Sequence, residues 1–373
     1  MNTNVFRKVL IVGAGFAGCV SARILADSGS TCVIIERRDH VGGNAFDYKD
    51  EHGILVHRYG PHIFHTNSKK VFSFLSRFTD WHFYEHQVLA SVENKLYPIP
   101  INQNTINSLY GLDLNEEEVQ KYLESVKVSL EVKTSEDVVL SSVGIDLCDK
   151  FFRGYTRKQW GLELRDLSPG VAARIPTRCN TDNRYFEDQY QFIPSPSYSK
   201  MFENMLDHKN IRLILGTKFD KKLFSDSGFD HLIFTGPIDE YYDFKFGRLP
   251  YRSLSFDFKY FANCDSFQPV AQINYPNDFE FTRVTEFKKI TGQRHSGTTL
   301  AYEFPQASGE PFYPIPTPDN AKQFSKYQGE AKDETCVTFI GRLAQYKYFN
   351  MDQVVGSAIA KVQALIDDWN SST

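Results

Sequence analysis

The sequence predicts an α/β fold in which a discontinuous Rossmann-like domain carries an inserted helical domain and an antiparallel β-sheet domain. A strand, a glycine-rich turn, a helix and a second strand follow one another within residues 9–36. Apolar runs of the same kind recur late in the chain, at residues 231–234 and 337–340. The segments between them have helical or alternating patterns, so one domain must be assembled from separate stretches of chain.

The N-terminal unit has the length and order of a βαβ motif. Residues 9–12 (Val-Leu-Ile-Val) form a continuous apolar run, as expected for a buried parallel strand. We expect a helix over residues 17–28, which Gly29 ends as a C-cap residue. The apolar run of residues 32–35 is the second strand, and Glu36 follows it directly.

The middle and later segments have different periods. Residues 115–130 begin with acidic side chains that suit a helix N-terminus, and residues 137–160 also have a largely helical pattern. Residues 250–305 alternate between apolar and polar side chains, which indicates an antiparallel sheet. A last helix is expected from about residue 351 to residue 366. We therefore expect a Rossmann-like domain (residues 1–80, about 190–245 and 315–373), a helical domain (about 100–185) and a sheet domain (about 81–99 with 246–314).

Composition excludes several classes of function. The 373 residues are 41% hydrophobic and 24% charged, which is typical of a soluble globular protein with two or three domains. A net charge of −4 provides no basic field for nucleic acid, and no apolar run is long enough to span a membrane. The six cysteines are scattered without a CxxC pair. We therefore expect no metal site and no disulfide framework, and a reducing, cytoplasmic location.

The turn after the first strand matches the dinucleotide fingerprint G-x-G-x-x-G at Gly13, Gly15 and Gly18. The first glycine permits the tight turn, the second lets a pyrophosphate approach the backbone, and the third lets helix and strand pack closely. The helix N-terminus then offers free N–H groups to the phosphates. Glu36, about 20 residues further on, has the position of the acid that accepts from a ribose hydroxyl.

The dinucleotide is expected to be FAD rather than NAD. Residues 36–44 contain an acid and then R-x-x-x-x-G-G directly after the second strand, which resembles FAD-binding proteins. Thr235-Gly236 after the later strand resembles another loop of those proteins. The residues expected to hold FAD on this ground are Gly13, Gly15, Phe16, Gly18, Glu36, Arg37, Gly42, Gly43 and Asn44.

Several longer strings, unusual in composition, follow in order over nearly the whole chain. They are residues 59–66 (YGPHIFHT), 154–161 (GYTRKQWG), 174–176 (RIP), 185–186 (YF), 235–239 (TGPID), 251–254 (YRSL), 282–283 (TR), 313–314 (YP) and 341–343 (GRL). Together these strings resemble the UDP-galactopyranose mutase family.

The resemblance implies a mutase that changes the size of a sugar ring without net redox change. In that family, reduced FAD attacks the anomeric carbon through N5 and displaces the nucleoside diphosphate, so the nucleophile belongs to the cofactor. The resulting flavin–sugar adduct opens, O4 closes the smaller ring, and the diphosphate returns. The expected reaction interconverts UDP-galactopyranose and UDP-galactofuranose for cell-surface polysaccharide biosynthesis. The resemblance also implies a homodimer, primed by NAD(P)H or another reductant.

The resemblance also assigns the residues that would meet the substrate. Arg174 and Arg283 match diphosphate-binding arginines, because a planar guanidinium can grip phosphate oxygens in bidentate fashion. Three tyrosines match phosphate contacts, namely Tyr185, Tyr313 and Tyr348. The other implied substrate contacts are Phe151, Phe152, Tyr155, Trp160, Asn274 and His86.

Three residues are implied near the flavin: His62, His65 and Arg342. The arginine cation would favour the anionic reduced ring. Together with Arg174 and Arg283, these residues are the catalytic candidates. The resemblance adds Tyr59, Arg342, Asn350 and Met351 to the expected cofactor contacts.

Some positions depart from the family pattern. Asn350 stands where an aspartate is expected, and His86 stands where many members carry an asparagine close to the sugar. Cys179 and Thr181 replace larger aromatic residues, which would admit additional bulk such as a thymine methyl group. The alternative substrates are therefore dTDP-fucopyranose and UDP-N-acetylgalactopyranose.

Two functions of other classes stay open from the sequence. An amine-oxidase-like flavin oxidoreductase would share the fold, but paired arginines do not suit a neutral amine. A non-catalytic nucleotide-sugar sensor has only Asn350 in its favour, and the intact arginines weigh against it. Turnover under reducing conditions separates the three functions.

Overall fold

The computed structural model describes residues 6–371, and its centre is a five-stranded parallel sheet in the order β10-β2-β1-β11-β17. Every neighbouring pair of strands in this sheet is parallel. The strands come from distant parts of the chain and are β1 (Lys8–Val12), β2 (Thr31–Ile35), β10 (Ile211–Ile214), β11 (His231–Phe234) and β17 (Val337–Phe339). The predicted discontinuous Rossmann-like fold is thus confirmed; the ends of its expected ranges, residues 1–5 and 372–373, lie outside the described residues.

Alternate residues of β1 enter two separate cores. Val9 and Ile11 pack with α1 (Phe16–Asp27), α7 (Tyr198–Leu206) and α12 (Met351–Ser371). Leu10 instead packs with α9 (Ile238–Tyr241) and α11 (Pro318–Asp333). Because successive side chains of a strand point to opposite faces, the sheet is covered on both sides, which explains its continuous apolar strands.

A second, seven-stranded sheet has the order β16-β12-β15-β14-β13-β7-β8. It is antiparallel, as its alternating sequence predicts, except that β13 and β7 run parallel. That exception arises because β7 comes from a distant part of the chain and joins β13 without a hairpin. The strands are β7 (Val88–Val92), β8 (Lys95–Ile99), β12 (Tyr251–Phe261), β13 (Gln272–Asn274), β14 (Arg283–Glu286), β15 (Thr298–Gln306) and β16 (Tyr313–Pro314), with α10 (Phe287–Thr291) after β14.

The segment between β8 and β9 (Tyr190–Ser195) is largely helical, as the patterns of residues 115–130 and 137–160 predict. Its elements are α3 (Gln103–Tyr110), α4 (Glu116–Val126), α5 (Ser135–Leu147), the π turn η2 (Cys148–Arg153), α6 (Gly154–Trp160) and the 3-10 turns η3 (Leu164–Asp166) and η4 (Pro169–Arg174). Asn115 and Thr134 form capping boxes that begin α4 and α5. The helices share one core with β7 and β8, so the helical segment is packed against that edge of the sheet.

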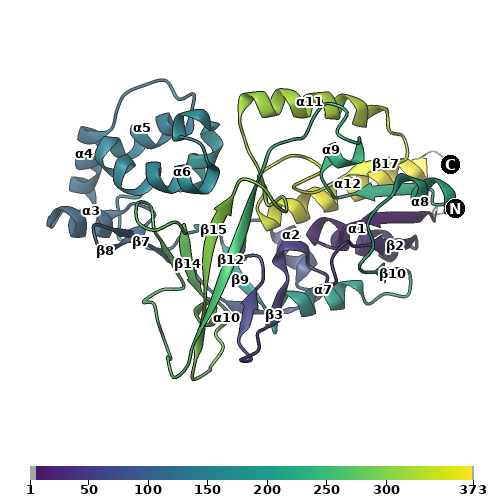
Figure 1. Cartoon of the computed structure of the whole chain (residues 1–373), viewed down its shortest axis with the longest axis horizontal. Helices are drawn as coiled ribbons and strands as arrows, with labels where there is room; N and C mark the ends of the chain where they lie inside the picture. The colour runs from purple at the N-terminus through teal and green to yellow at the C-terminus, as the bar shows by residue number, and fades with distance from the viewer. Residues whose placement is uncertain (1–5, 372–373) are drawn as a thin grey trace.

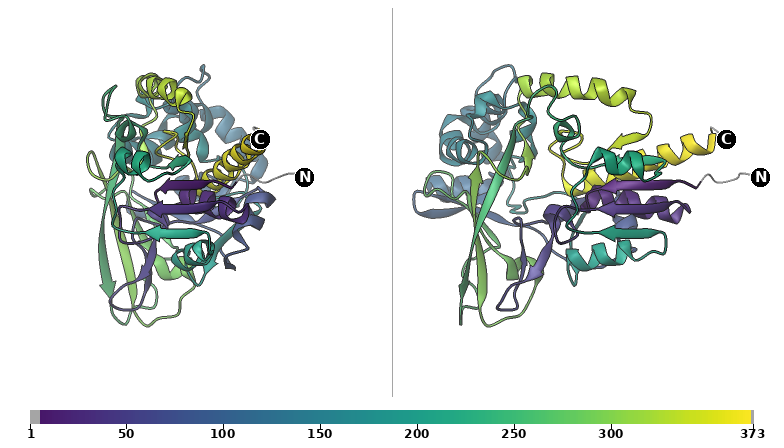
Figure 2. Two further views of the ribbon diagram at one scale, coloured as in Figure 1. Left: turned by 90° about the vertical axis from the view of Figure 1, so that its right-hand side faces the viewer. Right: turned by 45° about the vertical axis from the view of Figure 1, so that its right-hand side comes forward.

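The helices α3–α6 lie at the opposite end of the molecule from β1 and α12, with the long strands β12 and β15 between them (Figures 1 and 2). Smaller elements complete the fold: β3 (Asp47–Lys49), β4 (Leu55–His57), β5 (Phe64–Thr66), β6 (Asp80–Phe83), β9 (Tyr190–Ser195), η1 (Gly43–Ala45), α2 (Lys69–Leu75) and α8 (Lys221–Asp226). Between residues 6 and 371, no helix is both long and apolar enough to cross a membrane.

Candidate active site

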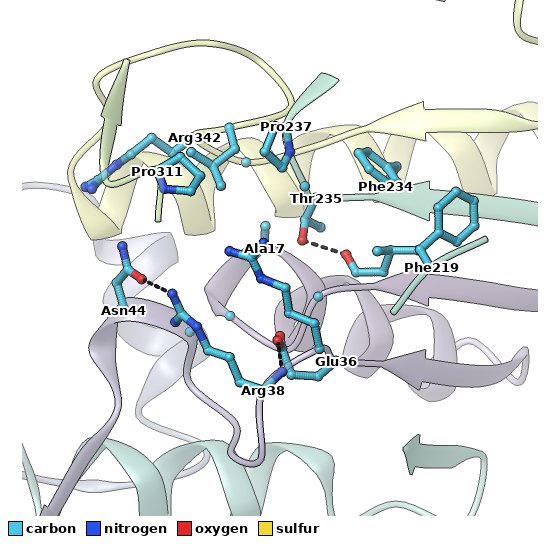
Figure 3. A pocket seen from close by; sticks show the side chains of 18 of the residues that line it. Ala17, Glu36, Arg38, Asn44, Phe219, Phe234, Thr235, Pro237, Pro311 and Arg342 are labelled. Atoms are coloured by element: carbon cyan, nitrogen blue, oxygen red, sulfur yellow. Dashed lines mark hydrogen bonds between the residues drawn. The ribbon is translucent and has the colours of Figure 1, made fainter. Parts of the chain in front are cut away.

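A cavity of about 860 Å³ opens where the parallel strands end. Its lining includes the residues that directly follow β1, β2 and β11, namely Gly13, Glu36 and Thr235. Arg342 and Asn44 lie at one end of the cavity, and Phe219 and Phe234 lie at the other (Figure 3). Ligands of open α/β sheets bind outside the carboxyl ends of the strands, so this cavity has the position of a dinucleotide site.

The glycine-rich turn leaves room for a group to approach the backbone. Gly13 has a φ of +99°, and a Cβ there would lie 2.2 Å from the Thr235 hydroxyl oxygen. The backbones of Gly15 and Gly43 face each other, because a Cβ on Gly43 would lie 3.0 Å from the Gly15 Cα. Both glycines line the cavity at the start of α1. These residues fit a bound pyrophosphate, which needs close backbone approach and free N–H groups.

Glu36 is a buried carboxylate at the end of β2. Its Oε2 accepts from the Ala14 N–H at 2.8 Å, and its Oε1 accepts from the Arg38 N–H at 2.9 Å. A carboxylate has about four acceptor sites, so these bonds orient the group and leave capacity for a ribose hydroxyl. The Arg38 side chain donates to the Asn44 amide oxygen at 3.0 Å (Figure 3).

The structure brings most of the expected cofactor residues to this cavity. Those that line it are Gly13, Gly15, Phe16, Glu36, Arg37, Gly42, Gly43, Asn44, Arg342 and Met351. Gly18 instead packs under the turn, since a Cβ there would lie 1.9 Å from the Gly13 carbonyl oxygen. Tyr59 lines a neighbouring cavity, where its hydroxyl bonds to His40 at 2.8 Å. Asn350 does not line either cavity and contacts Arg174.

His62 lies in the cavity lining beside Arg342. Burial, with a smaller contribution from His57, lowers the pKa of His62 to about 3, so the ring is neutral. Its Nδ1 faces the Gly60 carbonyl oxygen at 2.9 Å and must donate there, which leaves the lone pair on Nε2. Burial also lowers the pKa of Arg342, whose guanidinium donates to the carbonyls of Phe349 at 2.6 Å and Phe312 at 3.3 Å.

A cluster of arginines and tyrosines adjoins this end of the cavity. The guanidinium carbon of Arg342 lies 5.4 Å from the ring centre of Tyr313 and 6.0 Å from that of Tyr348. Arg174, at the end of η4, lies 4.0 Å over the Tyr348 ring and donates to the Tyr348 carbonyl at 3.0 Å. It also donates to the side-chain oxygen of Asn350. Arg174 and Arg342, which come from distant parts of the chain, thus both lie close to the ring of Tyr348.

Arg283 reaches the same cluster from the seven-stranded sheet. Asn274, Arg283 and Glu303 are direct cross-strand neighbours on β13, β14 and β15, so their side chains share one face. Arg283 approaches the buried Glu303 carboxylate to 2.8 Å, although the two atoms lack the alignment of a hydrogen bond. Burial alone would lower the pKa of Arg283, but Glu303 raises it well above its ordinary value. Within residues 6–371, the buried Arg283 Nε has no hydrogen-bond partner.

The expected substrate tyrosines surround these arginines. Arg283 lies within electrostatic reach of Tyr155, Tyr313 and Tyr348, and Tyr185 lies within reach of both Arg174 and Arg283. Burial raises the pKa of Tyr155, Tyr185 and Tyr313, so these hydroxyls stay protonated and can donate. The Trp160 ring closes the group, 5.3 Å from Tyr348 and 6.2 Å from Tyr313.

The other expected site residues do not line the cavity. Phe151 is 4% exposed and packs against Tyr97 in the helical core, with Phe152 at the edge of that core. The His65 Nδ1 bonds to Asp188 at 2.7 Å, and its ring stacks on Phe186 rather than lining the cavity. His86 is buried, and its Nδ1 bonds to the Tyr84 hydroxyl at 3.0 Å.

The two positions expected to admit a thymine methyl group also lie apart from the cluster. Cys179 is near Glu116 and Glu124 of α4. Thr181 is exposed, and its carbonyl accepts from Asn104 at 3.1 Å. Neither residue is brought to the arginine–tyrosine cluster.

Sequence reasoning missed several residues of these sites. Glu303 is a single acid in an apolar strand, Leu300-Ala301-Tyr302-Glu303-Phe304, and a buried acid in such a strand needs a cationic partner. That pattern was a usable signal. Arg38, next to the recognised Arg37, was another. The cavity residues Lys218 and Phe219 follow β10 without any motif, so nothing in the sequence indicated them.

Comparison with known proteins identifies relatives that share this sequence and fold. The family model for UDP-galactopyranose mutase matches residues 150–348, and a model for NAD(P)-binding Rossmann-like domains matches residues 11–78. The chain is 38% identical to dTDP-fucopyranose mutase of Escherichia coli over 96% of its own length and 98% of that protein. It is 37% identical to a Klebsiella pneumoniae protein named Probable UDP-galactopyranose mutase, over 95% of this chain and 93% of that one.

A crystal structure of reduced UDP-galactopyranose mutase has the same fold, with a TM-score of 0.79 at 17% identity over 97% of this chain and 94% of that one. The fold and the cavity therefore define a protein with a dinucleotide-binding, Rossmann-like domain. The chain belongs to the UDP-galactopyranose mutase family. It is an isomerase of the mutase type, which confirms the predicted class of enzyme.

Proposed function

We propose that this enzyme interconverts the pyranose and furanose forms of a nucleoside-diphosphate hexose and requires reduced FAD. UDP-galactopyranose is the first substrate to test, and dTDP-fucopyranose and UDP-N-acetylgalactopyranose are the alternatives. When bound and reduced, FAD would supply a nucleophile, its N5, for the anomeric carbon of the sugar.

The convergence of Arg174, Arg283 and Arg342 on one set of tyrosines carries the proposal. Arg342 also lines the cofactor cavity, so the cationic cluster and that cavity are continuous. A diphosphate that leaves and returns during each cycle must be held throughout by fixed positive charge. Arg283 supports this role further, because it has a buried N–H without a partner.

The chain's own residues would then divide the work. Arg174 and Arg283 hold the diphosphate, and the protonated hydroxyls of the tyrosines donate to its oxygens. The neutral His62 presents a lone pair at Nε2 beside the cofactor cavity, where it can accept a hydrogen bond without adding charge. Arg342 places a cation at the flavin end of the cavity, which favours an anionic reduced cofactor.

The relatives do not decide the sugar, since identities of 38% to a dTDP-fucopyranose mutase and 37% to a named UDP-galactopyranose mutase are nearly equal. All three candidates present the same diphosphate, so the arginines bind each of them alike. The choice must come from contacts to the sugar and the base.

The test is direct. Protein with FAD, reduced by dithionite, is incubated separately with UDP-galactopyranose, UDP-N-acetylgalactopyranose and dTDP-fucopyranose, and each furanose product is quantified. We expect one of them to be converted in the reduced sample only, without stoichiometric consumption of NAD(P)H. Equal turnover by oxidised and reduced protein would reject the proposed chemistry.

A further inference from the structure

The side-chain nitrogen of Lys158 lies in a cage of backbone carbonyl oxygens. It donates to the carbonyl of Tyr275, and to those of Asp278 at 2.9 Å, Phe281 at 3.2 Å and Phe279 at 3.3 Å. An ammonium group has three N–H donors, so these four acceptors share one positive charge. All four carbonyls belong to the loop that joins β13 to β14, whereas Lys158 lies on α6.

A second contact joins the same loop to the same helix. A Cβ on Gly154, the first residue of α6, would lie 2.4 Å from the Asn277 side-chain oxygen and 2.5 Å from the Pro276 carbonyl oxygen. The loop therefore approaches as closely as a glycine allows. Asn277 also donates to the Lys150 carbonyl at 2.9 Å. Helix and loop thus touch at two points, one helical turn apart.

The two elements joined by Lys158 lead into the arginine–tyrosine cluster, where Tyr155 lies within electrostatic reach of Arg283. The helix α6 carries Tyr155 and Trp160. The loop begins directly after Asn274 and ends directly before Arg283. Four carbonyl dipoles that point at one place repel one another unless a cation lies between them. Without that cation this repulsion is not offset, and the loop that ends directly before Arg283 loses its hydrogen bonds to α6.

We propose that Lys158 is a positioning residue for the nucleotide: its charge holds the β13–β14 loop against α6 and sets the separation between Tyr155 and Arg283. The proposal rests on the nucleotide-sugar function proposed above. Lys158 does not touch the ligand in this role, and its effect reaches the ligand through the loop.

The titration of Lys158 gives this role a measurable signature. Burial lowers the pKa of Lys158 to about 8, and the Asp278 carboxylate opposes part of that shift. A further charged group at this place is Arg252, which donates to the Lys158 carbonyl at 3.2 Å and stays charged. As pH rises through about 8, the folded protein loses the ammonium, so nucleotide affinity should fall between about pH 7 and about pH 9.

The test uses the FAD-containing protein with UDP as probe and calorimetry as readout. Lys158→Met should bind UDP about tenfold more weakly or worse at about pH 7, because hydrogen bonds to a charged group are lost. Lys158→Arg keeps its charge at every pH used, so its affinity should not fall between about pH 7 and about pH 9. The control is Lys322→Met, at a side chain on α11 that is 80% exposed, and it should match the wild type.

The outcomes separate this inference from the proposed function. Unchanged UDP affinity in a folded, FAD-containing Lys158→Met protein overturns the positioning role and leaves the mutase function standing. If Lys158→Met does not fold, the wild type and Lys158→Arg are compared instead. A fall in UDP affinity between about pH 7 and about pH 9 in the wild type alone supports the positioning role. The same fall in UDP affinity in both proteins overturns it. A wild type that binds neither UDP nor dTDP at any pH overturns both proposals.

Discussion

Arg174 donates one guanidinium N–H to the side-chain oxygen of Asn350 and a second, at 3.0 Å, to the main-chain oxygen of Tyr348. These bonds tie the end of η4 to the start of α12. Because an amide is neutral, Asn350 orients the guanidinium without cancelling its charge. An aspartate at this position would form an ion pair with Arg174 instead.

The first prediction follows from this contact. Asn350→Asp should weaken UDP binding up to about fivefold, because the new carboxylate competes with the diphosphate for Arg174, and partly exposed ion pairs are worth about 1 kcal/mol or less. The dissociation constant for UDP measures the effect, and added salt should reduce it. Tighter binding by the variant would show that Arg174 does not face the diphosphate.

Arg174 itself should be essential. Arg174→Ala is expected to lower kcat/KM at least about thirtyfold, since an unpaired charge in a partly buried site costs roughly 2–5 kcal/mol and each 1.36 kcal/mol is about tenfold in rate. Arg174→Lys should recover only part of the loss, because lysine lacks the forked geometry. Arg212→Ala, at an exposed arginine of β10, is the control. Normal kinetics in Arg174→Ala would mean that the arginine is misassigned.

Glu303 should stabilise the fold at the expense of binding. The side chains of Glu303 and Arg283 are 3% and 19% exposed, so Glu303→Gln should lower the free energy of unfolding by roughly 2–3 kcal/mol. A diphosphate would then replace the lost carboxylate, so UDP should raise Tm more in Glu303→Gln than in the wild type. The control is Glu310→Gln, at an acid that is 45% exposed and pairs with Arg38, with an expected effect below about 1 kcal/mol. Equal UDP-induced shifts of Tm in Glu303→Gln and wild type would argue against a ligand at Arg283.

His86 should make the free energy of unfolding fall at low pH. Burial lowers the pKa of His86 from 6.5 to about 3, so between these values the unfolded chain binds a proton that the folded protein does not. The part of the free energy of unfolding that depends on neutral His86 is fully present above pH 6.5 and is lost as pH falls towards about 3. From about pH 7 to about pH 5 this amounts to roughly 2 kcal/mol. Urea unfolding of His86→Asn should show a pH dependence smaller by that amount.

The rest of the acid dependence should remain in that variant, because His57 and His62 are buried with pKa values also lowered to about 3. A matched control is His52→Asn, at an exposed histidine on the turn between β3 and β4. If His86→Asn and His52→Asn keep the same pH dependence as the wild type, His86 titrates alike in the folded and unfolded chains.

A substitution at Gly15 should impair cofactor binding without impairing folding. A Cβ at Gly15 would lie 3.6 Å from the Gly43 Cα, an ordinary contact, and its φ of −83° suits any residue. Gly15→Ala should therefore fold normally but lose much of its FAD, because the methyl group occupies the place of the pyrophosphate. Flavin absorbance per protein measures this, with Gly329→Ala on α11 as the control, where a Cβ meets nothing within 4 Å. Full FAD content in Gly15→Ala would place the pyrophosphate elsewhere.

The sequence by itself determined the parts of the protein that are encoded within continuous stretches. The turn from β1 into α1, the position of Glu36 after β2 and the helices of residues 116–160 follow from local periodicity, glycine spacing and capping residues. These features depend on neighbours within one or two turns of chain, so a short window of sequence contains all the interactions that decide them. The resemblance then indicated which distant residues belong to one enzyme family.

Only the tertiary structure decided which of those residues meet. Glu303 faces Arg283 because of the register between β14 and β15, and Asn350 meets Arg174 because α12 packs beside the end of η4. The parallel pairing of β7 with β13 likewise has no local signal. Each contact joins residues far apart in the chain, and its geometry depends on how whole elements pack. Side-chain pattern fixes the elements, but the register and packing that bring charges together depend on the complete core.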